Sequence, residues 1–125
     1  MKGKKMTRRA GKSEDADINS DDDKTLWSVF LTNKLSKKTD KLPGDINALF
    51  HALRKSLETI GPEQKKWPNY GPVLGKPKGQ DYRHCHLNKG QPTYVVVWKV
   101  IDRKKRIMEI RHVDTHEKTN YDRIR

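Results

Sequence analysis

The chain has 125 residues, of which only 32% are hydrophobic and 35% are charged, so it predicts one small domain with a thin core. Its formal net charge of +12 favours a polyanionic partner: a nucleic acid, the ribosome or an acidic protein. No apolar stretch is long enough to cross a bilayer, no secretory signal is visible, and a single cysteine excludes an internal disulfide, so we expect a cytoplasmic protein without membrane contacts.

Residues 1–24 predict a disordered, charged tail. A basic block from Lys2 to Lys12 precedes an acidic block from Glu14 to Asp23, and apolar residues are almost absent. Such a segment cannot bury enough apolar surface to offset the entropy lost on ordering. The folded domain is therefore expected to span residues 25–125, and most of the net positive charge lies in its second half.

The first half of this domain predicts one strand and two helices. Residues 26–31 favour a strand, and Thr32 or Asn33 can cap a short helix over residues 34–41. Asp45 is a natural N-cap for a second helix, which Gly61-Pro62 ends. This helix has apolar residues at steps of three and four, which predict one buried face: Ile46, Leu49, Phe50, Leu53, Leu57 and Ile60.

The second half predicts an irregular connection followed by three strands. Residues 62–80 are rich in proline, glycine and lysine, and the strand-like runs are residues 82–87, 93–101 and 106–115. The last two runs flank a short basic turn and predict a hairpin. The complete order predicts an α+β fold in which two helices pack on one face of a four-stranded, mainly antiparallel sheet. The other face of the sheet is expected to stay open and to carry the function.

Histidines are the main candidates for chemistry. Strand alternation places Tyr82, His84 and His86 on one face and Arg83, Cys85 and Leu87 on the other. In the last strand, the same alternation predicts a shared face for Met108, Ile110, His112, Asp114 and His116. Clustered imidazoles indicate acid–base chemistry, because histidine titrates near neutral pH.

A metal site formed by His84, His86, His112 and His116 is the alternative to acid–base chemistry. No carboxylate-rich or cysteine-rich spacing supports it, so we predict neither a metal nor another cofactor. Cys85 lacks the setting of a reactive thiol and is expected to be buried and inert.

Cations and aromatic residues in the second half suit contact with RNA. Trp67 and Tyr70 can stack on unpaired bases or clamp the connection onto the sheet, whereas Trp98 is expected in the core. The predicted nucleic-acid contacts, which would bind phosphates, are Lys76, Lys78, Lys99, Arg103, Lys104, Arg111, Lys118 and Arg123.

Read in order, these motifs resemble the RelE/ParE superfamily of toxins. The first half contributes Trp27-Ser-Val-Phe-Leu-Thr, the break at Leu42-Pro43 and the helix end at Gly61-Pro62. The second half contributes residues 77–83, residues 93–100 and the pair Thr115-His116 followed by residues 121–124. This ending is similar to the HigB and YafQ branches. The resemblance covers about residues 25–125 and rests on the order of short motifs.

The resemblance implies a RelE-like fold and a type II toxin that a cognate antitoxin neutralises. It also implies that the toxin contacts operator DNA only through this antitoxin. RelE-like members are metal-independent mRNA interferases that cut mRNA in the ribosomal A site and inhibit translation. Catalytic roles are thereby implied for His84, His86, His116, Tyr121 and Arg83. Val95 departs from the pattern, because RelE has a catalytic arginine at this point. Arg83, Lys99 or Arg111 would then stabilise the phosphate charge.

The expected reaction is attack of a ribose 2′-OH on its own 3′ phosphate, with His116 and either His84 or His86 exchanging protons. Two other functions remain open at this point. A ParE-like protein has the same fold but inhibits DNA gyrase. A noncatalytic module would bind RNA or the ribosome through its positive charge alone.

Overall fold

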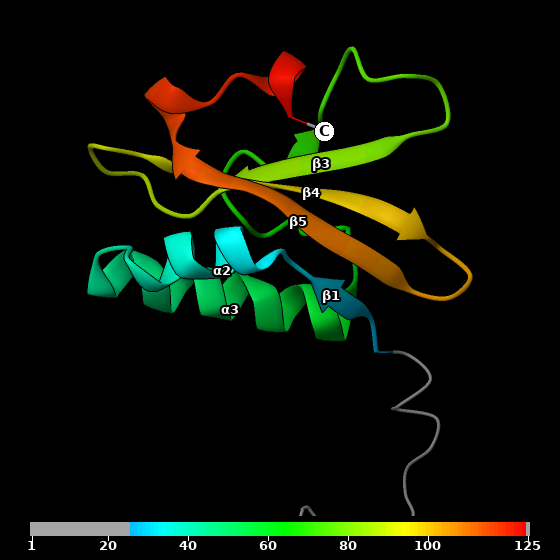
Figure 1. The fold of residues 1–125 in the computed structure, drawn as a ribbon, viewed down its shortest axis with the longest axis horizontal. Helices are drawn as coiled ribbons and strands as arrows, with labels where there is room; N and C mark the ends of the chain where they lie inside the picture. Colours follow the sequence, from blue (N-terminus) through cyan, green and yellow to red (C-terminus); the bar gives the residue numbers. More distant parts are fainter. Residues whose placement is uncertain (1–25, 125) are drawn as a thin grey trace, which may run out of the picture.

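The computed structural model describes residues 26–124, so the tail predicted over residues 1–24 lies outside the described residues. Two helices pack on one face of a five-stranded sheet with the order β1-β5-β4-β3-β2 (Figure 1). The elements are β1 (Ser28–Phe30), α2 (Asn33–Asp40), α3 (Gly44–Ile60), β2 (Gly71–Pro72), β3 (Asp81–His86), β4 (Tyr94–Asp102), β5 (Ile107–Thr115), and two short 3-10 helices, η1 (His116–Lys118) and η2 (Tyr121–Arg123).

The predicted α+β arrangement is confirmed, and the predicted strand number is wrong by one. β3, β4 and β5 are antiparallel, and β1 lies parallel to β5 at one edge. The additional strand, β2, consists of Gly71 and Pro72, which pair with His84 and Arg83. Glycine and proline disfavour strands, so the connection over residues 62–80 contained no local signal for this pairing.

The helices follow the predicted apolar pattern, with differences at their ends. The hydroxyl of Thr32 accepts a hydrogen bond from the backbone N–H of Leu35 and caps α2. Asp45 lies inside the first turn of α3 rather than at its N-cap, a place where its charge favours the helix dipole. Ile60, at the last turn, is exposed because α3 has passed the edge of the core there.

The main core lies between the helices and the sheet. Phe50, Leu53 and Leu57 of α3 meet Val96 and Trp98 of β4, together with apolar residues of the neighbouring strands. Trp98 is fully buried, as predicted. The ring of Tyr70 stacks on it at 6.2 Å between centroids, and Trp67 packs against the same core. Both aromatic residues of the connection therefore clamp it onto the sheet.

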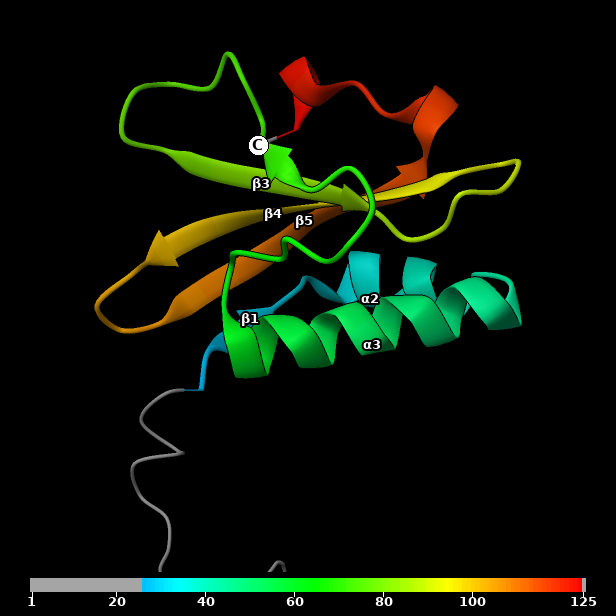
Figure 2. The same ribbon diagram turned by 180° about the vertical axis from the view of Figure 1, so that it is seen from behind.

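The opposite face of the sheet is partly covered, contrary to the expectation that it stays open. After β5 the chain turns back over this face, and Figures 1 and 2 show η1 and η2 on the side away from the helices. A second apolar cluster forms there from Tyr82, Val95, Val97 and Ile124, with Tyr121 packed against it. Burial of Ile124 is the physical reason that residues 116–124, here called the C-terminal segment, lie on the sheet.

A β-bulge in β5 overturns the predicted shared face of its residues. Val97 pairs with His112 whereas Trp98 pairs with Ile110, so Arg111 is an extra residue that interrupts the alternation. Met108 and Ile110 face the helices. His112 and Asp114 lie on the other face, beside Val97 and Val95. The bulge thus brings His112 to the face that also carries His84 and His86.

Within residues 26–124, none of the helices has the length and the apolar character that crossing a bilayer requires.

Candidate active site

Two histidines from distant segments meet at the end of the sheet where β3 finishes. The rings of His86 and His116 lie 5.5 Å apart between centroids and are nearly perpendicular, at 74°. The backbone N–H of His116 donates to the carbonyl of Thr93 at 2.7 Å, which holds the start of η1 against β4. His116 is exposed, whereas His86 is partly buried. The pair borders a cavity of about 330 Å³ that is lined by His86, Gln91, Thr93, His116 and Glu117.

A second aromatic pair lies on the same face. The ring of Tyr121 lies over His84, with 5.3 Å between the centroids. His84 precedes His86 by two residues on one face of β3, which places the two side chains roughly 7 Å apart along the strand. The Nδ1 atom of His84 is buried and has no hydrogen-bond partner within the described part of the chain.

Burial controls the protonation of these groups. It lowers the pKa of His84, and the charge on His86 acts in the same direction. Burial also lowers the pKa of His86, with a further contribution from the charge on His116. The pKa of Tyr121 is raised, again mainly by burial. His84 and His86 are therefore neutral near pH 7, and a neutral imidazole can accept a proton.

Lys76 connects the loop between β2 and β3 to the C-terminal segment. Its ammonium group donates hydrogen bonds to the carbonyl oxygens of Tyr121 and Ile124, each at 2.5 Å. It also lies 4.9 Å from the centre of the Tyr82 ring, which Lys99 approaches to 5.4 Å from its own strand. Lys76, whose predicted role as a nucleic-acid contact stays a prediction, is partly buried and holds the C-terminal segment.

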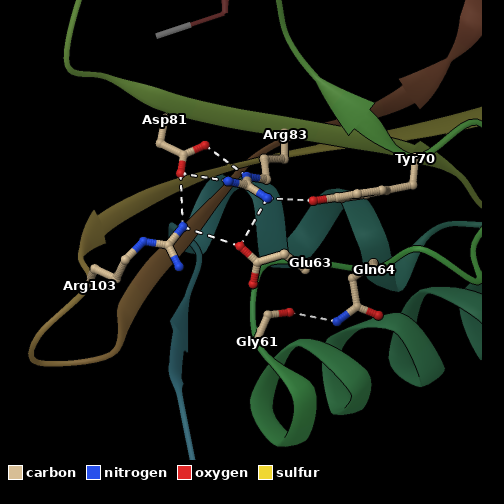
Figure 3. A network of polar contacts seen from close by, with 7 residues as sticks. All are labelled: Gly61, Glu63, Gln64, Tyr70, Asp81, Arg83 and Arg103. Atoms are coloured by element: carbon tan, nitrogen blue, oxygen red, sulfur yellow. Dashed lines mark hydrogen bonds and ion pairs between the residues drawn. The ribbon is translucent and has the colours of Figure 1, made fainter.

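Arg83 lies on the helix side of the sheet, away from the histidines. Figure 3 shows it between Asp81, Glu63 and Tyr70. It binds both carboxylate oxygens of Asp81, at 2.8 and 3.1 Å, pairs with Glu63 at 3.0 Å, and donates to the Tyr70 hydroxyl at 2.5 Å. Arg103 completes the network by pairing with Glu63 at 3.3 Å and with Asp81 at 3.1 Å.

The network neutralises two of the predicted functional cations. Hydrogen bonds from Arg83 hold the pKa of Asp81 below its ordinary value, and those to Asp81 raise the pKa of Arg83. Strand alternation explains the placement, because Arg83 points away from the face of its neighbours Tyr82 and His84. Arg83 is thus separated from the histidines by the sheet, and Arg103 is exposed at the edge of the same network. Their predicted functional roles stay predictions.

The remaining predicted cations are distributed unevenly. Lys118 in η1 and Arg123 in η2 are exposed on the C-terminal segment, and Lys78 is exposed in the loop that contains Lys76. Arg111, at the bulge, forms an ion pair with Glu109. Lys104 is exposed in the turn beyond Asp102, at the end of β4 opposite to the histidine pair. Lys118, Arg123 and Lys78 are thus the exposed cations that belong to the segments around the site.

Sequence reasoning missed one polar contact beside the site. The Nε2 atom of His112 lies 3.0 Å from the hydroxyl of Thr119. Thr119 had no pattern that distinguished it from other surface threonines. The position of His112 depends on the bulge, which the alternating pattern of β5 does not reveal.

Two other predictions concern thiol and metal chemistry. Cys85 is fully buried, as expected, and burial raises the pKa of its thiol to about 12, so it is not a nucleophile near neutral pH. Among residues 26–124, no group of three or more histidine, cysteine, aspartate or glutamate side chains gathers in a way that can hold a metal ion.

Comparison with known proteins identifies the fold. No family model and no curated protein matches the chain. The structure matches a chain of the crystal structure of the archaeal RelE-RelB complex from Pyrococcus horikoshii OT3, with a TM-score of 0.60 and 18% identity. The match covers 75% of this chain and 99% of that chain. The protein therefore has a RelE-like fold, as the sequence resemblance implied.

Proposed function

We propose that the protein is the toxin of a type II toxin–antitoxin system and a metal-independent endoribonuclease that cuts mRNA in the ribosomal A site, thereby inhibiting translation. The observation that carries the proposal is the contact between His86 and His116 beside an open cavity, within a RelE-like fold. Two adjacent imidazoles can supply both proton transfers of a transesterification. The protein would bind mRNA on the ribosome in the cytoplasm.

In the proposed reaction, the neutral imidazole of His86 takes the proton of a ribose 2′-OH. The 2′ oxygen then bonds to the adjacent phosphorus, and the bond from phosphorus to the 5′ oxygen breaks. Protonated His116 gives its proton to that departing oxygen, which leaves a cyclic 2′,3′-phosphate and a 5′-hydroxyl. The lowered pKa of His86 supports its role as the base.

Neighbouring groups have supporting roles in this proposal. Tyr121 and His84 would orient the nucleotide beside the cavity, because their rings lie on the same face. Lys118, Arg123 and Lys78 would bind phosphates and stabilise the added negative charge of the transition state. Arg83 is left out, because it is engaged on the other side of the sheet.

We further propose a protein antitoxin as partner, with operator DNA met only through it. The matched structure is a RelE-RelB complex, which supports this partnership by likeness of fold.

The test is mapping of mRNA ends in a translation reaction that contains purified protein. His116→Ala is expected to lower the cleavage rate about 10²- to 10⁴-fold, the usual loss when an acid–base group is removed. His51→Ala, which removes an exposed histidine of α3, is the matched control and should cleave normally.

Near-normal cleavage by the His116→Ala protein contradicts the mechanism. Inhibition of DNA gyrase without mRNA cuts indicates the ParE-like alternative. Retained RNA binding with neither activity indicates a noncatalytic module.

A further inference from the structure

Hydrogen bonds, rather than packing, hold the turn that carries His116. None of the three residues of η1 is buried. The bond from His116 to Thr93 holds the start of the turn, and Thr119 closes its end: the Thr119 hydroxyl donates to the carbonyl of Thr115 at 2.8 Å, and its backbone N–H donates to the carbonyl of His116 at 3.2 Å. Because η1 buries no apolar side chain, these bonds decide where the His116 ring stands.

The hydroxyl of Thr119 is itself anchored to the sheet. It carries a single proton, which it gives to Thr115, so it accepts the hydrogen bond from Nε2 of His112 at 3.0 Å. The neutral ring with its proton on Nε2 and the imidazolium both retain this donor. Two hydrogen bonds thus fasten Thr119, three residues after His116, to His112 and Thr115 of β5.

The bulge at Arg111 makes this anchor possible. Without the extra residue, alternation would direct His112 into the helix-side core with Met108 and Ile110. With it, His112 lies under the C-terminal segment, where only a few residues separate its partner Thr119 from His116. Bulges often redirect a side chain beside a functional site, and here the redirected side chain is a hydrogen-bond donor.

We propose that His112 and Thr119 are positioning residues that hold the ring of His116 against that of His86. The inference rests on the proposed function only for its catalytic consequence. The positioning itself is a property of the free protein. Loss of the Thr119 hydroxyl would let η1 turn away from Thr93, and the distance between the two imidazoles would then vary.

Thr119→Val is the critical variant, because valine has nearly the shape of threonine without its hydroxyl. Thr119→Ser keeps the hydroxyl and tests rescue. Thr59→Val is the matched control: the Thr59 hydroxyl also donates to the carbonyl four residues earlier, that of Lys55, but it lies on α3. At the other end of the chain of hydrogen bonds, His112→Leu removes the donor to Thr119. His112→Gln retains a donor there.

The first measurement is the nuclear Overhauser contact between the ring protons of His86 and His116 in the free protein. It should be present in the wild type, in Thr119→Ser and in Thr59→Val, and lost in Thr119→Val and His112→Leu. The second is mRNA cleavage, where Thr119→Val should lower kcat about 10- to 100-fold, because misplacement of a reacting group by about 1 Å has effects of this size. KM should change less than kcat, because Lys78 and Arg123, two of the three proposed phosphate contacts, lie outside η1.

An unchanged ring contact in Thr119→Val overturns the proposal, whatever the protein cleaves. Equal losses of cleavage in Thr119→Val and Thr119→Ser also overturn it, because the hydroxyl is then not the cause. Should Thr119→Val fail to fold, the two His112 variants provide the test. The proposal expects the ring contact to be lost in His112→Leu and kept in His112→Gln, and it is overturned if His112→Leu keeps the contact. If His116→Ala cleaves normally, the proposed function fails. The positioning proposal is then tested only by the nuclear Overhauser contact between the rings of His86 and His116.

Discussion

Arg83 shows how the surroundings of a single charged residue decide what it can do. Its guanidinium group contacts Asp81, Glu63 and Tyr70, so its hydrogen-bonding capacity is used inside the protein. An arginine committed in this way fastens the connection after α3 to the start of β3. Most of its N–H groups are therefore already engaged within the described part of the chain.

Replacement of Arg83 should therefore affect stability more than catalysis. We expect Arg83→Met to lower the free energy of unfolding by about 1 kcal/mol, because the pair with Asp81 is partly exposed and screened by water. Urea unfolding measures this loss, with Lys105→Met, a change at an exposed turn residue, as the control. A severe loss of mRNA cleavage at unchanged stability would show that Arg83 acts on the substrate after all.

At this scale the sequence predicted which neighbouring residues share a strand face better than which distant segments meet. Alternation in β3 placed His84 and His86 on one face, which the structure confirms because their neighbour Cys85 lies in the core on the other side. The nearness of His116 to His86 follows from a turn after β5, and no local pattern encodes it. Arg111 looks like any other outward residue of an alternating strand, so the bulge and the place of His112 could not be predicted.

Among the elements, the C-terminal segment is held by a lysine as well as by the burial of Ile124. Lys76 donates to two carbonyl oxygens of the segment, and Ile124 adds the apolar contact beside them. We expect Lys76→Met to lower the free energy of unfolding by about 1–3 kcal/mol, as the loss of hydrogen bonds to a charged group does. Amide hydrogen exchange at Ile124 should become faster, because the segment then opens more often.

Lys78→Met provides the control for this prediction, since Lys78 is exposed in the same loop. Equal exchange rates at Ile124 in the Lys76 and Lys78 variants would mean that packing alone holds the segment.

The elements themselves were largely predictable, because local residue patterns determine them. The periodic apolar residues of α3, the turn before β5 and the apolar run of β4 each indicate one structure. The covered second face was not predictable, because it depends on Ile124, one apolar residue near the end of a polar stretch, and on its contact with a strand far away in the sequence.

For the whole molecule, the partly buried imidazoles predict a loss of stability at acidic pH. Burial lowers the pKa of His84, His86 and His112 from the ordinary value of 6.5, so the unfolded chain binds more protons than the folded protein below that pH. Stability is therefore greatest above about pH 6.5 and falls as the pH drops through the folded pKa values. Asp81 and Asp114 add to this loss only near their ordinary value of 3.8.

Thermal unfolding between pH 8 and pH 5 measures the effect. The unfolding temperature should fall with pH in the wild type and fall less in His84→Gln, which removes one of the imidazoles. His51→Gln is the control, because His51 lies exposed on α3. The same slope in all three proteins would exclude His84 as a source of the pH dependence.

The parallel pairing of β1 with β5 determines when, during synthesis, the sheet can be completed. Ser28 and Phe30 find their partners only at Ile107 and Glu109, and contacts between such distant segments form late because loop closure opposes them. During synthesis, the edge that β1 needs stays inside the exit tunnel until most of the described chain has emerged, and His116 and Tyr121 follow later still. A half-made nascent chain thus lacks the pair of imidazoles on which the proposed cleavage depends.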